Sequence, residues 1–280
     1  MPTKEKRETG LIKLFQSAYE NGAWAADLLE IPDEKIDGGV DGFIERASDG
    51  CRLAIEHTLI QPHIDDRKDF ARFEANLLPI ESDKSLAIPG RITQVSVKSG
   101  TLKAGSSFSL VSELLHEWLR QNVPFLPIGR SSFECPSTDA GGSSISLLTK
   151  VYADPTYPGS FLLRRFYEED TLGVVVEKVL REKLPKLANT PADQRVLLLE
   201  REQMQLDELR ISREIDARRP EFVALEKIQI WFAETVFYTR EGAVEFNQYE
   251  SNKLIHSLQF YNFRLKSKSD GGFATIVERI

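Results

Sequence analysis

The stretch "VDGFIERASDGCRLAIEHT", residues 40–58, contains two strand-like segments separated by a turn signal. The Asp-Gly dipeptide at 49–50 is typical of a two-residue β-hairpin turn. A turn centred on that dipeptide places Phe43 opposite Glu56. We therefore expect Asp41 to lie about one cross-strand diagonal from Glu56, within reach of a shared ion.

The second strand of this hairpin delivers polar residues directly after an apolar run. Residues 53–55 are apolar, and Glu56, His57 and Thr58 follow them without a break. Side chains alternate along a strand, so Glu56 and Thr58 point to one side and His57 to the other. An ionised carboxylate is costly to bury without a partner. Glu56 is therefore either a strand end in water or a neighbour of a group that needs a carboxylate, whereas His57 is expected to be a sheet-face residue rather than a general base.

An amphipathic helix is predicted upstream, over residues 5–21, and Gly22 is a plausible end for it. Glu8 falls on the apolar face of this helix at ~100° per residue, one turn before Leu11. The favourable dipole at a helix N-terminus also accounts for Glu8 without any chemistry. The other apolar residues on this face are Ile12, Phe15 and Tyr19.

The last third of the chain predicts a helix over 172–188 and a β-α-β unit over 195–235. Continuous apolar strands joined by a helix are typical of parallel pairs covered on both faces. Pro185 should kink or weaken the helix near its end. Lys183 projects into the apolar stripe of that helix, so it either reaches past the core to water or meets an anion. The stripe comprises Val176, Val179, Leu180 and Leu187.

The region between these parts, residues 62–170, has a different character and holds 8 of the 13 prolines and 7 of the 17 glycines. We expect it to be a large α+β insertion or elaborated subdomain. Its predicted helices cover 64–81 and 106–122, and its predicted strands cover 91–98, 145–153 and 160–168.

Composition indicates an ordinary globular chain of 280 residues, with 41% hydrophobic and 28% charged residues. No segment is apolar enough to predict a membrane span, and no secretory signal is evident, so cytoplasm is the expected location. Two cysteines are too few for a zinc site of their own. The net charge of −7 argues against an extended nonspecific DNA coat but not against a local basic patch.

The three acids resemble a motif of the PD-(D/E)xK nuclease-like superfamily. In that family an acid from the first helix, an aspartate at the start of one strand and an E-x-K on the next hairpin strand gather a divalent metal. Glu8, Asp41 and Glu56 match these positions, but Thr58 stands where the lysine belongs. A turn residue between glycine-rich steps is the competing interpretation of Asp41.

The resemblance implies an α/β fold with a restriction-endonuclease-like mixed sheet flanked by helices. Its core would comprise residues 1–61 and 171–240, with the insertion at 62–170 and a C-terminal extension at 241–280. It further implies a Mg²⁺-dependent nuclease that hydrolyses the phosphodiester bonds of nucleic acid, with the metal held by Asp41 and Glu56.

In that reading Glu8 supports the site and Lys183 replaces the missing lysine. Two alternatives stay open at this point. One is a catalytically inactive nuclease-like fold that binds nucleic acid or protein, and the other is an unrelated α/β protein in which Glu56 only ends a strand. No P-loop or G-x-S-x-G motif suggests another chemistry, and the sequence does not indicate an oligomeric state.

Overall fold

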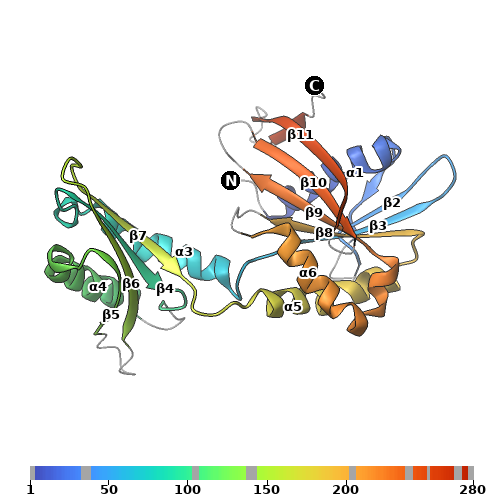
Figure 1. The fold of residues 1–280 in the computed structure, drawn as a ribbon. Coiled ribbons are helices and arrows are strands. Elements are labelled where there is room, and N and C mark those ends of the chain that lie inside the picture. Colours follow the sequence, from blue (N-terminus) through green and yellow to red (C-terminus); the bar gives the residue numbers. More distant parts are fainter. Residues whose placement is uncertain are drawn as a thin grey trace. The chain divides into compact units, whose positions relative to one another are not determined.

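The computed structural model divides the chain into two compact units, unit 1 (residues 1–64 and 171–280) and unit 2 (residues 65–170). Each unit has its own sheet and its own core and is described by itself (Figure 1). The structure describes residues 4–32, 39–102, 107–136, 144–201, 206–236, 242–250, 253–267 and 273–276, without the side chains of 4–7, 236, 242–243, 258–267 and 273–276.

Unit 1 is built on an eight-stranded mixed sheet in the order β1-β2-β3-β8-β9-β10-β11-β12. The central strands β3, β8 and β9 are parallel, and the flanking pairs are antiparallel. The strands are β1 Leu29–Glu30, β2 Gly42–Glu45, β3 Arg52–Leu59, β8 Gln194–Arg201, β9 Gln229–Val236, β10 Gly242–Glu250, β11 Lys253–Ser267 and β12 Phe273–Ile276.

Helices cover both faces of the central strands (Figure 1). Helix α1 (Lys4–Gly22) packs on one face, against Leu53 and Ile55 of β3. Helices α5 (Leu172–Asn189) and α6 (Glu208–Arg218) pack on the other face, and short 3₁₀ turns follow at Arg219–Glu221 and Val223–Lys227. Burial on both faces is why these strands are almost continuously apolar in sequence.

Several predicted elements of unit 1 are found, with three differences. The sequence predicts that Pro185 kinks or weakens the helix near its end, whereas α5 continues past Pro185 to Asn189. The path of α1 departs from helical geometry at Tyr19, and Glu20 and Asn21 then have positive φ before Gly22. Strands β10 and β11, which the sequence analysis assigns to an extension, continue the main sheet.

The hairpin β2–β3 has a longer turn than the sequence predicts. Arg46 N donates to Cys51 O at 2.9 Å, which leaves a four-residue loop, Ala47 to Gly50, between the strands. Phe43 consequently pairs with Ala54, and the expected pairing of Phe43 with Glu56 is wrong by two residues. Because the error is an even number of residues, every side chain stays on its predicted face.

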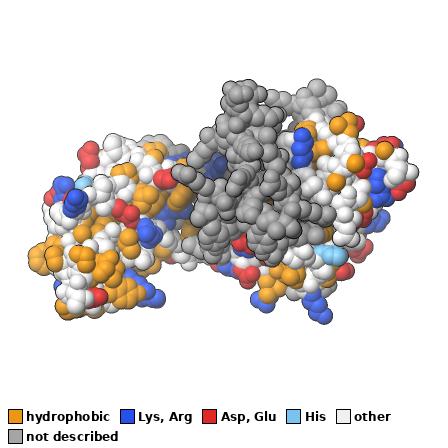
Figure 2. Space-filling model, turned by 90° about the horizontal axis from the view of Figure 1, so that it is seen from above, with side chains coloured by type: hydrophobic (Ala, Val, Ile, Leu, Met, Phe, Trp, Pro, Cys, Tyr) orange, Lys and Arg blue, Asp and Glu red, His pale blue; other side chains and the backbone are white. Residues whose placement is uncertain are grey.

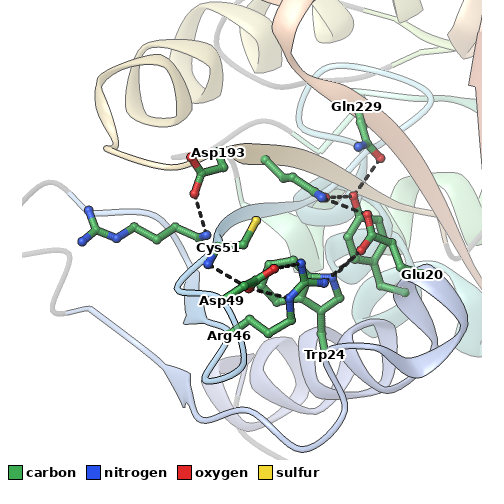
Figure 3. A network of polar contacts seen from close by, with 10 residues as sticks. Glu20, Trp24, Arg46, Asp49, Cys51, Asp193 and Gln229 are labelled. Atoms are coloured by element: carbon green, nitrogen blue, oxygen red, sulfur yellow. Dashed lines mark hydrogen bonds and ion pairs between the residues drawn. The ribbon is translucent and has the colours of Figure 1, made fainter.

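Polar contacts fix this hairpin at its turn (Figure 3). The guanidinium of Arg46 pairs with Asp49 and lies 4.6 Å from the centroid of the Trp24 ring. Hydrogen bonds from Arg46 and from the backbone N–H of Cys51 lower the pKa of Asp49 to about 2. At the start of β3, Arg52 N donates to Asp193 Oδ2 at 2.8 Å. Contacts at the turn and with Asp193, just before β8, therefore stabilise the four-residue loop and the register that it sets.

Unit 2 has a four-stranded sheet in the order β5-β6-β4-β7, with β4 and β7 parallel and the other pairs antiparallel. Helices α3 and α4 pack on one face of the sheet around an apolar core. Strand β5 is not among the strands that the sequence predicts. The elements are α3 Asp66–Asn76, β4 Arg91–Lys98, α4 Phe108–Asn122, β5 Gly129–Cys135, β6 Ile145–Ala153 and β7 Ser160–Phe166, with 3₁₀ turns at Leu78–Ser82, Lys84–Leu86 and Val123–Phe125.

Candidate active site

Glu56 is fully buried near the carboxyl end of β3, on the face that α5 covers. Its register neighbour on β8 is Leu197, which belongs to the apolar core beneath α5. A carboxylate in such surroundings requires charged or hydrogen-bonding partners. Partners arrive from the segment before β2 and from α5.

Asp41 is the partner from the segment before β2. The observed register places it directly beside Glu56, closer than the predicted diagonal. Asp41 N donates to Glu56 Oε2 at 3.2 Å, and the carboxylate of Asp41 accepts from His57 N at 2.7 Å through Oδ2. Backbone hydrogen bonds thus hold both carboxylates at one end of the sheet.

Lys183 is the partner from α5, as the sequence analysis allowed. Its Nζ donates to Glu56 Oε1 and lies 3.8 Å from Asp41 Oδ2. Lys183 lies on α5 among the buried residues Leu180, Leu184 and Leu187, and only 17% of its side chain is exposed. The lysine does not snorkel past the core to water; it meets the two carboxylates.

Lys186 is a second basic partner that the sequence analysis did not identify. It lies one helical turn beyond Lys183, and its Nζ is 3.4 Å from Glu56 Oε1. The i, i+3 spacing of Lys183 and Lys186 was the available signal, because residues three apart share a helix face. Thr58 is half-buried on the same side of β3 as Glu56.

Glu8 lies against the other side of β3. Its Oε1 is 4.0 Å from His57 Nδ1, on the face that α1 covers, and 31% of its side chain is exposed. Successive strand residues point to opposite faces, so Glu56 and His57 belong to two separate polar groups. The structure therefore brings Asp41, Glu56 and Lys183 together and places Glu8 beside His57.

His57 is part of a buried polar row across the carboxyl ends of the parallel strands. His57 Nε2 is 3.1 Å from Glu200 Oε2 on β8, and Thr235 Oγ1 on β9 donates to Glu200 Oε1 at 2.9 Å. An ionised carboxylate only accepts hydrogen bonds, so a contact with ionised Glu200 favours the tautomer with the proton on Nε2. The sequence analysis did not identify Glu200 and Thr235. Each comes at the end of a largely apolar run, and a polar residue in that position is usually a strand end exposed to solvent.

Arg201, the last residue of β8, and Glu208, the first residue of α6, form a further buried ion pair. Arg201 Nε lies 3.1 Å from Glu208 Oε1, and Arg201 also pairs with Glu234. Burial raises the pKa of the Glu208 carboxyl above its ordinary value, although Arg201 opposes the shift. Asn247 Nδ2 donates to Glu208 Oε2 at 3.1 Å.

A metal at this site would have Asp41 and Glu56 as its carboxylate ligands. Mg²⁺ is commonly bound by one or two carboxylates together with waters and substrate phosphates, so this donor set fits a hard divalent cation. The ammonium of Lys183 between the two carboxylates marks a position that favours positive charge. Within the described ranges, no group of three or more His, Cys, Asp and Glu side chains is arranged to hold a metal ion.

Comparison of the chain with protein-family models, with curated proteins and with solved structures gives no match. The assignment of function therefore depends on the site itself. None of the helices in the described part of the chain is long and apolar enough to cross a membrane.

Proposed function

We propose that this protein is a metal-dependent nuclease with a restriction-endonuclease-like core, in which Asp41 and Glu56 bind Mg²⁺. The observation that carries the proposal is the position of Lys183, whose ammonium reaches both carboxylates from α5. A lysine beside two carboxylates at a strand end is the charge arrangement of an E-x-K site, even though Thr58 occupies the motif position.

Each residue has a distinct role in the proposed hydrolysis. A divalent cation on Asp41 and Glu56 would polarise a phosphodiester oxygen and lower the pKa of an attacking water. With a cation on the two carboxylates, Lys183 would keep only part of its contact with them. Its charge would then orient the water or stabilise the negative charge that develops in the transition state. Glu8 lies beside His57 on the α1 face and is assigned no role in this step.

The second candidate function is a nuclease-like fold that binds nucleic acid or protein without catalysis. One observation favours it: Lys183 and Lys186 together already neutralise the two carboxylates. A divalent cation would have to displace two ammonium groups from the carboxylates. In this alternative the lysines stay in place and no cation binds. Metal binding therefore separates the two functions.

The decisive experiment is calorimetric titration with Mg²⁺ and Mn²⁺ combined with hydrolysis of labelled oligonucleotides. Wild type is expected to bind the cation and cleave, and Glu56→Gln to lose both. Lys183→Ala is expected to bind the cation more tightly, because a competing charge is gone, yet to cleave about 100- to 1000-fold more slowly. This opposite movement of affinity and rate is not expected of a lysine with a structural role only.

Lys178→Ala is the matched control, because Lys178 lies on the same helix with 71% of its side chain exposed. It should retain wild-type binding and cleavage. Circular dichroism of every variant confirms that the fold is intact. Absence of both heat and cleavage in folded wild type would reject the nuclease and leave the non-catalytic function.

A further inference from the structure

One face of the unit 2 sheet is not covered by the helices of that unit. Odd-numbered positions such as Val95, Leu147 and Leu163 are buried beneath α3 and α4. Even-numbered positions point the opposite way, and we call that side the outer face. On it, 40% of Leu148 and 46% of Tyr152 are exposed.

Two basic side chains lie directly opposite one another on the outer face. Arg130 of β5 and Lys150 of β6 are register partners. Like charges directly opposite on a sheet destabilise it. Among the described side chains no carboxylate is within ion-pair distance of either residue. An anion shared between the two would remove the repulsion, so this pair is suited to a phosphate group.

An aromatic ring accompanies the basic pair. Lys150 Nζ lies 4.8 Å from the centroid of the Tyr152 ring. Gln94 of β4 is the other register neighbour of Lys150 and adds an amide to the same region. Figure 2 shows hydrophobic and charged side chains next to one another on the surface of the body drawn on the left, which is unit 2.

Other charges on this face are already paired. Arg164 binds Glu81, and Lys98 binds Glu168. The carboxylate of Glu134, at the far end of β5, accepts hydrogen bonds from serine hydroxyls. The available positive charge is therefore concentrated at Arg130 and Lys150, beside Tyr152.

We propose that the outer face of unit 2 binds single-stranded nucleic acid, with phosphate at Arg130 and Lys150 and a base stacked on Tyr152. Open sheets that present basic and aromatic side chains suit single strands, because unpaired bases expose their faces for stacking. An acidic peptide would use the positive charge but not the ring. The role of this surface in presenting substrate rests on the proposed nuclease function, but the binding itself does not.

The test measures fluorescence anisotropy of labelled single-stranded oligonucleotides with the full chain in EDTA, where metal-dependent cleavage cannot occur. The double substitution Arg130→Ala/Lys150→Ala is expected to raise Kd at least about tenfold at low salt. It should also reduce the slope of log K against log salt by about 0.7, because the pair holds one phosphate and a single strand contributes about 0.7 per neutralised phosphate. Tyr152→Ala should raise Kd about tenfold through lost stacking, with little change in the salt slope.

Lys68→Ala is the control, because Lys68 lies on α3 with 72% of its side chain exposed. It should leave Kd unchanged. The proposal is overturned if wild type does not bind single strands, if the double variant binds as tightly as wild type, or if duplex DNA binds as well and Tyr152→Ala has no effect. Equal competition by polyglutamate would also overturn it, since that result indicates a general polyanion surface.

The two proposals fail in different ways. If the protein binds single strands in EDTA but does not cleave them in Mg²⁺, the proposed nuclease function is rejected and the proposed binding by the outer face stands. Cleavage in Mg²⁺ with an unchanged Kd for the double variant rejects the outer face and keeps the nuclease.

Discussion

The two units bury their sheets differently. The central strands of unit 1 are covered on both faces, by α1 and by α5 with α6. The sheet of unit 2 is covered by helices on one face only, by α3 and α4. On the central strands of unit 1 the buried ionisable side chains lie toward the carboxyl ends, as Glu56, His57 and Glu200 do. Unit 2 instead has a whole sheet face on which polar and aromatic side chains reach solvent.

This difference explains why the candidate site and the candidate binding surface lie in different units. A buried carboxylate needs fixed partners in a low-dielectric environment, and that environment strengthens each electrostatic interaction. An open sheet face cannot supply it, but it can make many weak contacts with an extended chain. We expect unit 1 to carry out chemistry and unit 2 to bind.

The largest expected effect tests whether the two cores are energetically separate. Phe15 is fully buried in unit 1 and packs edge-on against Trp231 and Phe246 at centroid distances of 5.2 and 5.3 Å. Phe15→Ala should lower the free energy of unfolding of unit 1 by about 3–5 kcal/mol, because the aromatic contacts are lost and a cavity remains. Urea unfolding in a Trp118→Phe background leaves Trp24 and Trp231 of unit 1 as the fluorescent probes, and labelling of Cys135 follows unit 2 in the same experiment.

Leu119→Ala is the matched variant in the core of unit 2. It should expose Cys135 at lower urea and leave unit 1 unchanged. If either substitution shifts both probes equally, the two units unfold as one, and the comparison between them loses its energetic basis.

A smaller effect distinguishes the units by the sign of their response to acid. Hydrogen bonds from Ser85, and then from His116 and Arg120, hold the pKa of Asp83 in unit 2 well below its ordinary value. Its contribution to stability is therefore present above the ordinary pKa and is lost as the pH falls through the lowered one. Glu208 in unit 1 has a raised pKa, so its contribution is present below the ordinary pKa and is lost as the pH rises through the raised one.

Unfolding free energies of Asp83→Asn and Glu208→Gln, measured between about pH 7 and pH 2, check these signs. Asp83→Asn should reduce the loss of stability in acid, and Glu208→Gln should remove a gain of stability on acidification from neutral pH. The same direction of change in both variants would contradict the assignment of opposite shifts.

The smallest expected effect concerns the two cysteines, one in each unit. Burial raises the pKa of the Cys135 thiol to about 11, so about one molecule in a thousand is thiolate there at pH 8. Cys51 is only half-buried at the β2–β3 turn, and its pKa is also raised, by desolvation and then by Asp193. A disulfide reagent should therefore modify Cys51 in the native protein and Cys135 only when unit 2 opens. Equal rates without denaturant would show that the core of unit 2 is accessible in the native state.

The sequence was a reliable guide wherever burial pattern alone decides the structure. Periodicity indicated α1, α5 and the apolar strands β3, β8 and β9, and the β-α-β order indicated that the last two are parallel. The apolar stripe of α5 also identified Lys183 as a residue out of place. The alternating polar residues of β5 lacked such a pattern, and that strand was not predicted.

Local turn chemistry was the weaker guide, because an Asp-Gly pair is compatible with more than one loop length. Asp49 accepts from Arg46 and from Cys51 N, and Gly50 takes positive φ at the end of a four-residue loop. These contacts shift the register by two residues and bring Asp41 directly beside Glu56. The prediction that Asp41 lies near Glu56 was right, but the two residues are direct cross-strand neighbours and not one diagonal apart.

By itself, the sequence determined which residues are anomalous: Glu56 at the end of an apolar strand and Lys183 on an apolar helix stripe. Only the tertiary structure decided which anomalies meet. It paired Glu56 with Asp41, Lys183 and Lys186, and it placed Glu8 with His57 across the sheet. The physical reason is that burial is a property of single residues and their periodicity, whereas ion pairing depends on the register and crossing of elements that can lie far apart in sequence, as Glu56 and Lys183 do.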